Sequence, residues 1–182
     1  MPKYAAFLRA VNLGPTRKTS SAELKSAFEG LGMVDVATFR TSGNVVFGTS
    51  RRSPAKLQAE LEMGLEQAFG FDFDIFLRPD EELVALAEHQ PFDPALVDAS
   101  DGKLQVMLLS EPPARKTRDE VLAHATDADR LAFGERELFW LPSGRMLESE
   151  LDLKAIGKLV GTNTMRTKGT IELIAEKFFA EG

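Results

Sequence analysis

Apolar and polar positions in the first third of the chain recur in a way that predicts a regular succession of strands and helices. Residues 4–12 form a short, mostly apolar run that stops at a Gly-Pro pair, as is typical of a buried strand entering a loop. Ser20 and Glu23 match a helix capping box, and apolar residues then recur at helical spacing as far as Gly32. We therefore expect a strand followed by a helix.

The next segments predict a hairpin, a second helix and another strand. Residues 36–40 and 44–47 are rich in β-prone side chains and are joined by a short turn. Ser53 and the proline after it predict the start of a helix that runs to about residue 69, with leucines on one face. Residues 71–77 then alternate as in a half-buried strand. The order βαββαβ is the split βαβ arrangement of ferredoxin-like folds.

The second half of the chain predicts a similar series after a helix over 80–89 and a loop over 90–102. We expect strands over 103–109, 130–133 and 137–141, and helices over 115–125, 149–159 and 169–180.

The fold class predicted from these patterns is α+β. We expect two ferredoxin-like βαββα(β) subdomains, with mixed or antiparallel sheets and helices packed on one face. The expected division places an N-terminal ferredoxin-like subdomain at 1–78 and a linker helix and loop at 79–102. A C-terminal α+β subdomain with a final packing helix follows at 103–182.

Composition limits the location and the chemistry of the protein. With 43% hydrophobic and 27% charged residues, the chain is typical of a globular protein. Zero cysteines exclude disulfides, thiolate metal sites and a cysteine nucleophile, and fit a reducing compartment. The N-terminus lacks the pattern of a secretory signal, and no apolar run is long enough to span a bilayer. We therefore expect a cytoplasmic protein that has no membrane partner.

Charge and histidine spacing argue against two further classes of function. The net charge of −6 opposes the binding of nucleic acid, whose nonspecific affinity comes from neutralising phosphates. The two histidines, His89 and His124, are too far apart in the sequence to form a local metal motif. No metal site is predicted, and the sequence leaves any cofactor open.

Several segments carry a resemblance to a known family. Ala6 to Gly14 and Ser42 to Phe47 resemble the start of domain-of-unknown-function family 1697. The resemblance implies a bacterial α+β protein built from two ferredoxin-like subdomains, and it implies no established activity. Further segments that support it are Gln90-Pro91-Phe92, Leu141-Pro142-Ser143-Gly144, Ser149 and Thr164-Met165-Arg166.

The chain departs from the family pattern near its C-terminus. Relatives tend to carry a stretch like Thr-Arg-Asn-Trp-Asn-Thr, whereas here Arg166 is followed by Thr167, Lys168, Gly169 and Thr170. If the asparagine and tryptophan of relatives contact a ligand, this chain binds that ligand differently or not at all.

Polar residues at the ends of the predicted strands form the candidate binding site. Arg9 lies inside an apolar strand, where a charge needs a carboxylate or an anionic partner. Short polar side chains and glycines near strand ends suit the cradling of an anion by backbone N–H groups. The predicted ligand-binding residues are Arg9, Asn12, Lys18, Ser42, Asn44 and Arg166.

A structural interpretation competes with each of these assignments. Arg9 can simply pair with an internal acid, and Lys18 can be a solvated loop lysine. Asparagine and glycine are also ordinary turn residues. The aromatic residues Phe69, Phe71, Phe73, Phe76, Phe139 and Trp140 are interpreted as core rather than as a surface that stacks nucleic-acid bases.

Three hypotheses of function remain open on the sequence. The first is binding of a small anionic ligand, phosphorylated or nucleotide-like, by the strand-end residues. The second is an enzyme that acts on a phosphorylated small molecule, which requires a titratable group in the same pocket. The third is a protein–protein interaction module or homo-oligomer without a ligand. The oligomeric state is left open.

Overall fold

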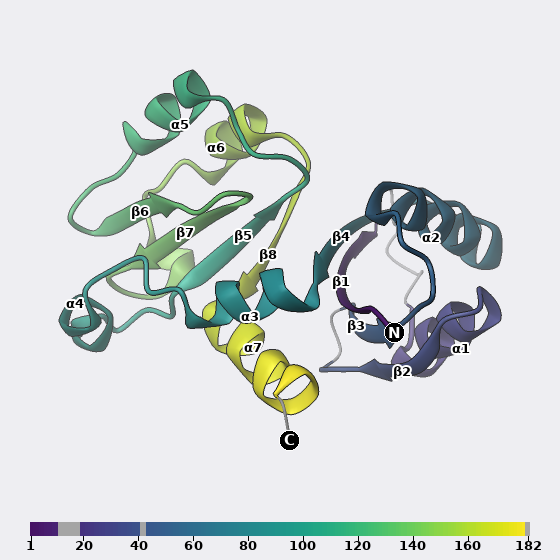
Figure 1. The fold of residues 1–182 in the computed structure, drawn as a ribbon. Coiled ribbons are helices and arrows are strands. Elements are labelled where there is room, and N and C mark those ends of the chain that lie inside the picture. The colour runs from purple at the N-terminus through teal and green to yellow at the C-terminus, as the bar shows by residue number, and fades with distance from the viewer. Residues whose placement is uncertain (11–18, 41–42, 181–182) are drawn as a thin grey trace. The chain divides into compact units, whose positions relative to one another are not determined.

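The protein is an α+β structure with two antiparallel sheets, as the sequence patterns predict. The computed structural model describes residues 1–10, 19–40 and 43–180. Two four-stranded sheets are present, and every strand pair in them is antiparallel (Figure 1).

The chain divides into two compact units, each with one of these sheets. Unit 1 consists of Met1–Ala85 and Ile174–Gly182, and unit 2 consists of Leu86–Leu173. The sequence-based division into a subdomain at 1–78, a linker at 79–102 and a subdomain at 103–182 remains a prediction. In the ranges that the structure describes, no helix is both long enough and apolar enough to cross a membrane.

Unit 1 shows the predicted βαββαβ succession. Its strands lie in the order β2-β3-β1-β4, so the first strand occupies a central position. Its elements are β1 (Lys3–Ala10), α1 (Ser21–Gly30), β2 (Val34–Thr38), β3 (Asn44–Gly48), α2 (Pro54–Phe69) and β4 (Phe73–Pro79).

The helices of unit 1 begin and end where the local sequence predicts. The Ser20 hydroxyl accepts a hydrogen bond from the Glu23 backbone N–H at 3.1 Å, which satisfies one of the unpaired donors of the first turn. The Ser53 hydroxyl caps α2 in the same way. Gly70 ends α2 at φ 77°, a left-handed conformation that glycine adopts without strain.

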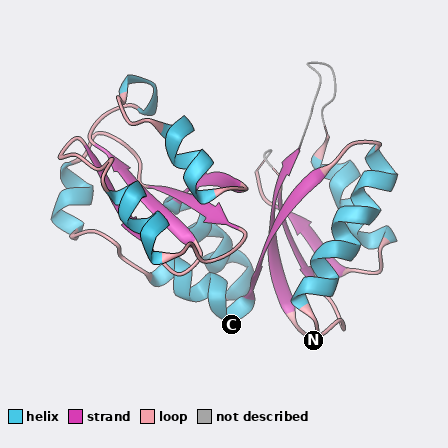
Figure 2. Cartoon of the chain, turned by 90° about the horizontal axis from the view of Figure 1, so that it is seen from above, coloured by secondary structure: helices cyan, strands magenta, loops and turns pink. Residues whose placement is uncertain are grey.

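The core of unit 1 lies between its sheet and the helices α1 and α2, which cover one face of that sheet (Figure 2). Alternate residues of β1, namely Tyr4, Ala6 and Leu8, pack into this core. The intervening positions therefore face the other side of the sheet, and that set includes Arg9. Phe69, Phe71 and Phe73 pack against one another and against the core, which confirms their interpretation as core residues.

Unit 2 repeats the βαββαβ succession after the last residues of one helix and a second, short helix. Its strands lie in the order β6-β7-β5-β8, which matches the arrangement of unit 1. The remaining elements of the chain are α3 (Asp80–Glu88), α4 (Pro94–Ala99), β5 (Gln105–Leu109), α5 (Arg115–Leu122), β6 (Asp129–Phe133), β7 (Glu137–Pro142), a 3₁₀ helix (Met146–Glu148), α6 (Leu153–Val160), β8 (Asn163–Thr167), α7 (Lys168–Ile174) and a π-helical turn (Ala175–Phe179).

Three elements of unit 2 differ from the sequence prediction. The strand β8 was not expected, because four of its five residues are polar and its pairing partner β5 lies far away in the sequence. The helix α4 occupies part of the expected loop and is capped by the Asp93 carboxylate. The helix predicted from residue 149 begins only at Leu153, where the Asp152 side chain caps it.

The core of unit 2 is formed by one face of its sheet together with α5 and α6. Met107, Leu109 and Leu138 from the strands contact Val121 of α5 and Ile156 of α6. Both aromatic residues of β7 for which a core position was predicted, Phe139 and Trp140, are buried as well.

Candidate functional site

Arg9 has the carboxylate partner that its position in an apolar strand calls for. The register of β1 with β4 places Arg9 opposite Asp74. The Nη2 atom of Arg9 lies 3.0 Å from Oδ2 of Asp74, and the two side chains are 45% and 31% exposed. The guanidinium is thus held in place at the surface and remains accessible to solvent.

Asn44 lies on the same face of the sheet as Arg9. It opens β3 opposite Phe7 of β1, two residues from Arg9, so both side chains point away from α1 and α2. Asn44 is buried, and its amide donates a hydrogen bond to the carbonyl oxygen of Phe39 at 3.0 Å. This bond supports the hairpin between β2 and β3.

Four further ligand-binding residues were predicted from the sequence, namely Asn12, Lys18, Ser42 and Arg166. Asn12, Lys18 and Ser42 lie outside the residues that the structure describes. Arg166 belongs to unit 2, whereas Arg9 and Asn44 belong to unit 1.

Arg166 is a largely buried cation on β8. Its Nη1 atom donates hydrogen bonds to Thr164 Oγ1 at 2.8 Å and to the Met165 carbonyl oxygen at 2.9 Å. Burial lowers its pKa from 12.5 to about 10, because the charged form loses solvation. The side chain therefore still carries its charge at neutral pH.

Lys168, two residues further on, is a buried lysine that lines a pocket. Its side chain is 6% exposed, and its ammonium group donates a hydrogen bond to the carbonyl oxygen of Ala87 at 2.7 Å. Burial lowers the pKa of Lys168, and the nearby Glu172 partly opposes this shift. Among the described residues, no carboxylate lies within ion-pair distance of this amine.

The pocket beside Lys168 has a volume of about 200 Å³ and lies entirely in unit 2. It combines a few polar groups with apolar walls, as small-molecule sites commonly do. Its lining residues are Ala87, His89, Gln90, Pro91, Phe92, Pro94, Val97, Asp98, Leu104, Lys168 and Glu172.

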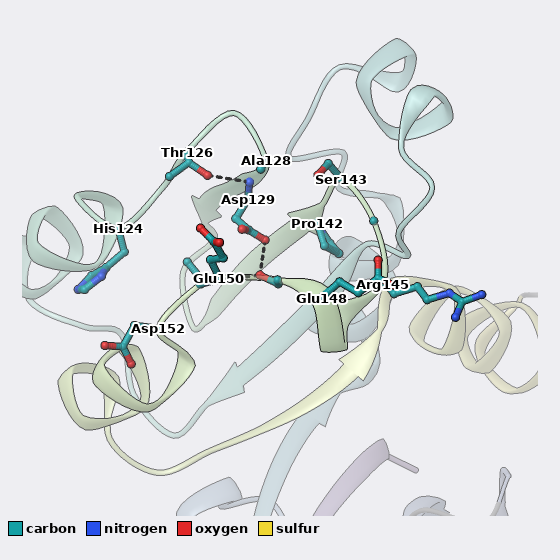
Figure 3. Close-up of a pocket in the computed structure, with 13 residues that line it drawn as sticks. His124, Thr126, Ala128, Asp129, Pro142, Ser143, Arg145, Glu148, Glu150 and Asp152 are labelled. Carbon is teal, nitrogen blue, oxygen red and sulfur yellow. Dashed lines mark hydrogen bonds between the residues drawn. The ribbon is translucent and has the colours of Figure 1, made fainter.

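A second and larger pocket of unit 2, of about 450 Å³, surrounds the buried carboxylate of Asp129 (Figure 3). Asp129 is 5% exposed, and its Oδ1 atom accepts hydrogen bonds from Trp140 Nε1 at 2.9 Å and from Ser149 Oγ at 2.7 Å. The Ser149 hydroxyl in turn accepts a hydrogen bond from the Leu151 N–H, so its own proton is directed at Asp129. Other ionisable residues that line this pocket are His124, Arg145, Glu148, Glu150 and Asp152.

The geometry gives no metal site in the part of the chain that is described. No group of three or more histidine, aspartate or glutamate side chains there is arranged to hold a metal ion. His89 and His124 line different pockets.

Three buried polar residues, Arg78, Lys168 and Asp129, were not among the site residues predicted from the sequence. Arg78 is fully buried on β4, where it donates to the Leu77 carbonyl oxygen and lies 3.7 Å from Glu82. The sequence does carry a signal for a buried charge at Arg78, because this arginine follows an apolar strand segment, as Arg9 does. Lys168 was noted only as a departure from the family pattern. Asp129 carries no local signal, because its partners come from other elements.

The fold and the pockets together define a two-sheet α+β protein with small pockets in its second unit. The chain belongs to the family described as protein of unknown function DUF1697, whose model matches residues 1–139.

One solved structure, described as the conserved bacterial protein SP0830 from Streptococcus pneumoniae, is similar in fold. It is 23% identical in sequence, with a TM-score of 0.67 over 96% of this chain and 97% of that one. A search of curated proteins found no match.

Proposed function

We propose that the protein binds a small anionic ligand in the unit 2 pocket that Lys168 lines. The observation that carries this proposal is a buried lysine that lines a pocket of about 200 Å³ and whose ammonium group donates to one backbone carbonyl oxygen. A lysine ammonium has three N–H donors, so two remain for a ligand.

The energetics of Lys168 support an anion rather than a neutral ligand. Burial of a charge is costly, and the lowered pKa of Lys168 reflects a desolvation cost that Glu172 offsets only in part. An anion beside the amine adds to this partial compensation. Arg166 lies two residues before Lys168 in the chain and is a second cation in this part of unit 2.

The size of the pocket limits the ligand. A volume of about 200 Å³ is below the range of about 300–1,000 Å³ typical of pockets for drug-sized ligands. The ligand class that fits is a phosphate or carboxylate on a small carbon skeleton. A whole nucleotide requires more space than this pocket offers.

A thermal-shift screen tests the proposal. Phosphate, sulfate, glycerol phosphate and small dicarboxylates are compared with chloride at matched ionic strength. A ligand that binds only the folded state stabilises it by about 2.7 kcal/mol at a concentration of 100 Kd. Lys168→Met removes the charge and keeps a long apolar side chain, so the shift should disappear in this variant.

Lys103→Met is the matched control, because Lys103 is an exposed lysine of the same unit outside the pocket. It should retain the full shift. Equal shifts in both variants, or no shift with any of these anions, would disprove the assignment to Lys168.

The strand-end residues of unit 1 are a second proposed anion contact. Arg9, oriented by Asp74, supports this, as do Arg40 and Lys177 beside the aromatic side chain of Phe39. The Arg9→Ala variant in the same screen separates the two sites, since it lies in the other unit. We also propose that the two sheets are ferredoxin-like subdomains and that the protein is cytoplasmic.

An enzyme acting on the bound anion is the alternative function that one observation favours. His89 and Lys168 line the same pocket, which provides a titratable group next to a cation. Phosphorus NMR of the protein incubated with each phosphorylated compound tests for turnover. His89→Gln should then abolish turnover while it preserves the thermal shift. Unchanged spectra for every compound favour simple binding.

A further inference from the structure

The Asp129 pocket is richer in carboxylates than the Lys168 pocket. Four carboxylate side chains line it, against a single guanidinium. Figure 3 shows the Glu150 side chain pointing toward the part of the pocket that holds Asp129, while the guanidinium of Arg145 extends away from it. Surface carboxylates alone do not define a site, whereas Asp129 is a buried carboxylate that two hydrogen bonds hold in place.

The two oxygens of Asp129 have different surroundings. Oδ1 accepts two hydrogen bonds, from Trp140 and from Ser149, and these fill its two lone-pair positions. Oδ2 accepts no hydrogen bond from any described residue. Every fully enclosed side-chain oxygen of the described residues has a hydrogen-bond partner. Because Oδ2 of Asp129 has none, this oxygen is not fully enclosed and is open to the pocket that Asp129 lines. A side chain that is 95% buried thus presents one unpaired acceptor to a cavity.

Oδ2 of Asp129 has a fixed position because the two groups that donate to Oδ1 are themselves fixed. Trp140 is almost completely buried, and Ser149 is held by the Leu151 N–H, so both donors are themselves immobilised. The carboxylate therefore does not need to reorganise when a donor enters the pocket. Preorganised acceptors of this kind favour binding, because the ordering cost is already met on folding.

We infer that this pocket binds a small organic cation through an ammonium group that donates to Oδ2 of Asp129. The surrounding carboxylates attract a cation, and the described residues offer no arrangement that suits a bare metal ion. A guanidinium pairs best with both oxygens of a carboxylate, and Oδ1 is already occupied. An ammonium group is a point-like donor and requires only the free oxygen.

The probe for this inference is 1,4-diaminobutane, with 1,4-butanediol as a neutral compound of similar shape. Trp140 is the single tryptophan of the chain, and its indole N–H lies 2.9 Å from the same carboxylate. A cation on Asp129 should change the emission of Trp140 in a saturable manner. Isothermal titration calorimetry measures the same Kd independently. Butanediol, and potassium chloride at equal ionic strength, should give no saturable change.

Asp129→Asn is the decisive variant. The asparagine carbonyl can still accept from Trp140 and Ser149, while the oxygen that faces the pocket becomes an N–H donor. Loss of a charge-assisted hydrogen bond should weaken diaminobutane binding by about tenfold or more. Glu150→Gln, at an exposed position of the pocket, should weaken it by a smaller factor. Glu135→Gln removes an exposed carboxylate of the same unit outside the pocket and should leave the Kd unchanged.

The opposite results would overturn the inference. Absence of saturable binding to the wild-type protein would do so, as would equal Kd values for wild type and a folded Asp129→Asn variant. If circular dichroism shows that Asp129→Asn is unfolded, the comparison of Glu150→Gln with Glu135→Gln decides. Equal effects of these two variants would mean that net charge alone attracts the amine.

Discussion

The hydrogen bond from Ser149 to Asp129 gives the sharpest stability prediction. Replacement of Ser149 by alanine removes the 2.7 Å donor to Oδ1 and also the acceptor of the Leu151 N–H. A hydrogen bond to a charged group contributes about 1.5–3 kcal/mol to folding. Because Ser149 is only half-buried and Asp129 keeps its bond from Trp140, we expect a loss of about 2 kcal/mol.

Urea denaturation followed by Trp140 emission measures this loss. Trp140 is 2% exposed in the folded protein and belongs to unit 2, so its emission reports the unfolding of that unit. With a slope of about 2 kcal/mol per molar urea, the midpoint should fall by about 1 M. The slope itself should not change, because the substitution does not alter the surface exposed on unfolding.

Ser143→Ala is the control, since Ser143 is an exposed serine of the same pocket that donates from its side chain to no described residue. Its effect should stay within about 0.5 kcal/mol. A Ser149→Ala midpoint equal to that of Ser143→Ala would refute the reasoning. In that case the Ser149 hydroxyl does not hold Asp129, and the orientation assigned to Oδ2 loses its support.

Three further predictions follow from other parts of the chain. Gly102→Ala should destabilise unit 2 by about 1–3 kcal/mol in the same urea assay, because the new methyl group would lie 2.5 Å from the backbone carbonyl oxygen of Pro142; an unchanged midpoint would contradict this. Lys168 has a folded-state pKa below its unfolded value of 10.5, so the unfolded chain binds more protons between the two values, and the stability that this group contributes should rise with pH in that window. The free energy of unfolding of the wild type minus that of Lys168→Met should therefore increase with pH up to about 10.5 in urea denaturation, whereas a constant difference would show that burial does not shift the pKa. Arg9→Ala should cost only about 0.2–1 kcal/mol by thermal denaturation, because its ion pair with Asp74 is partly exposed, and a loss of several kcal/mol would identify a structural role.

Local sequence patterns were sufficient to predict most of the elements. The capping serines Ser20 and Ser53 and the terminating Gly70 act through neighbours within four residues, so the limits of α1 and α2 can be read from short windows. The alternation in residues 71–77 likewise identified β4, whose residues Phe73, Ile75 and Leu77 face the helices. Phe76 lies on its other face and is buried as well. These signals are local because a helix cap or a strand period involves only adjacent turns or residues.

Elements stabilised by distant partners were not predicted, because the contacts that stabilise them do not involve neighbouring residues in the sequence. The strand β8, with the sequence Asn-Thr-Met-Arg-Thr, has little β pattern of its own and forms because β5 offers it an edge to pair with. The short helix α4 falls in a segment rich in proline, aspartate and serine, a composition typical of a loop. It forms a helix there because the Asp93 side chain caps its first turn.

The candidate sites show the same division between local and distant causes. Arg9 was recognisable as an arginine in an apolar strand, but its partner Asp74 follows from the pairing of strands that are 65 residues apart. Asp129 is an ordinary acidic residue in the sequence. It becomes a fixed acceptor because the fold brings the donors of Trp140 and Ser149 to one of its oxygens and leaves the other facing a cavity. The sequence alone sets which side chains are available and which faces are apolar, whereas burial and hydrogen-bond geometry arise only when distant segments pack together.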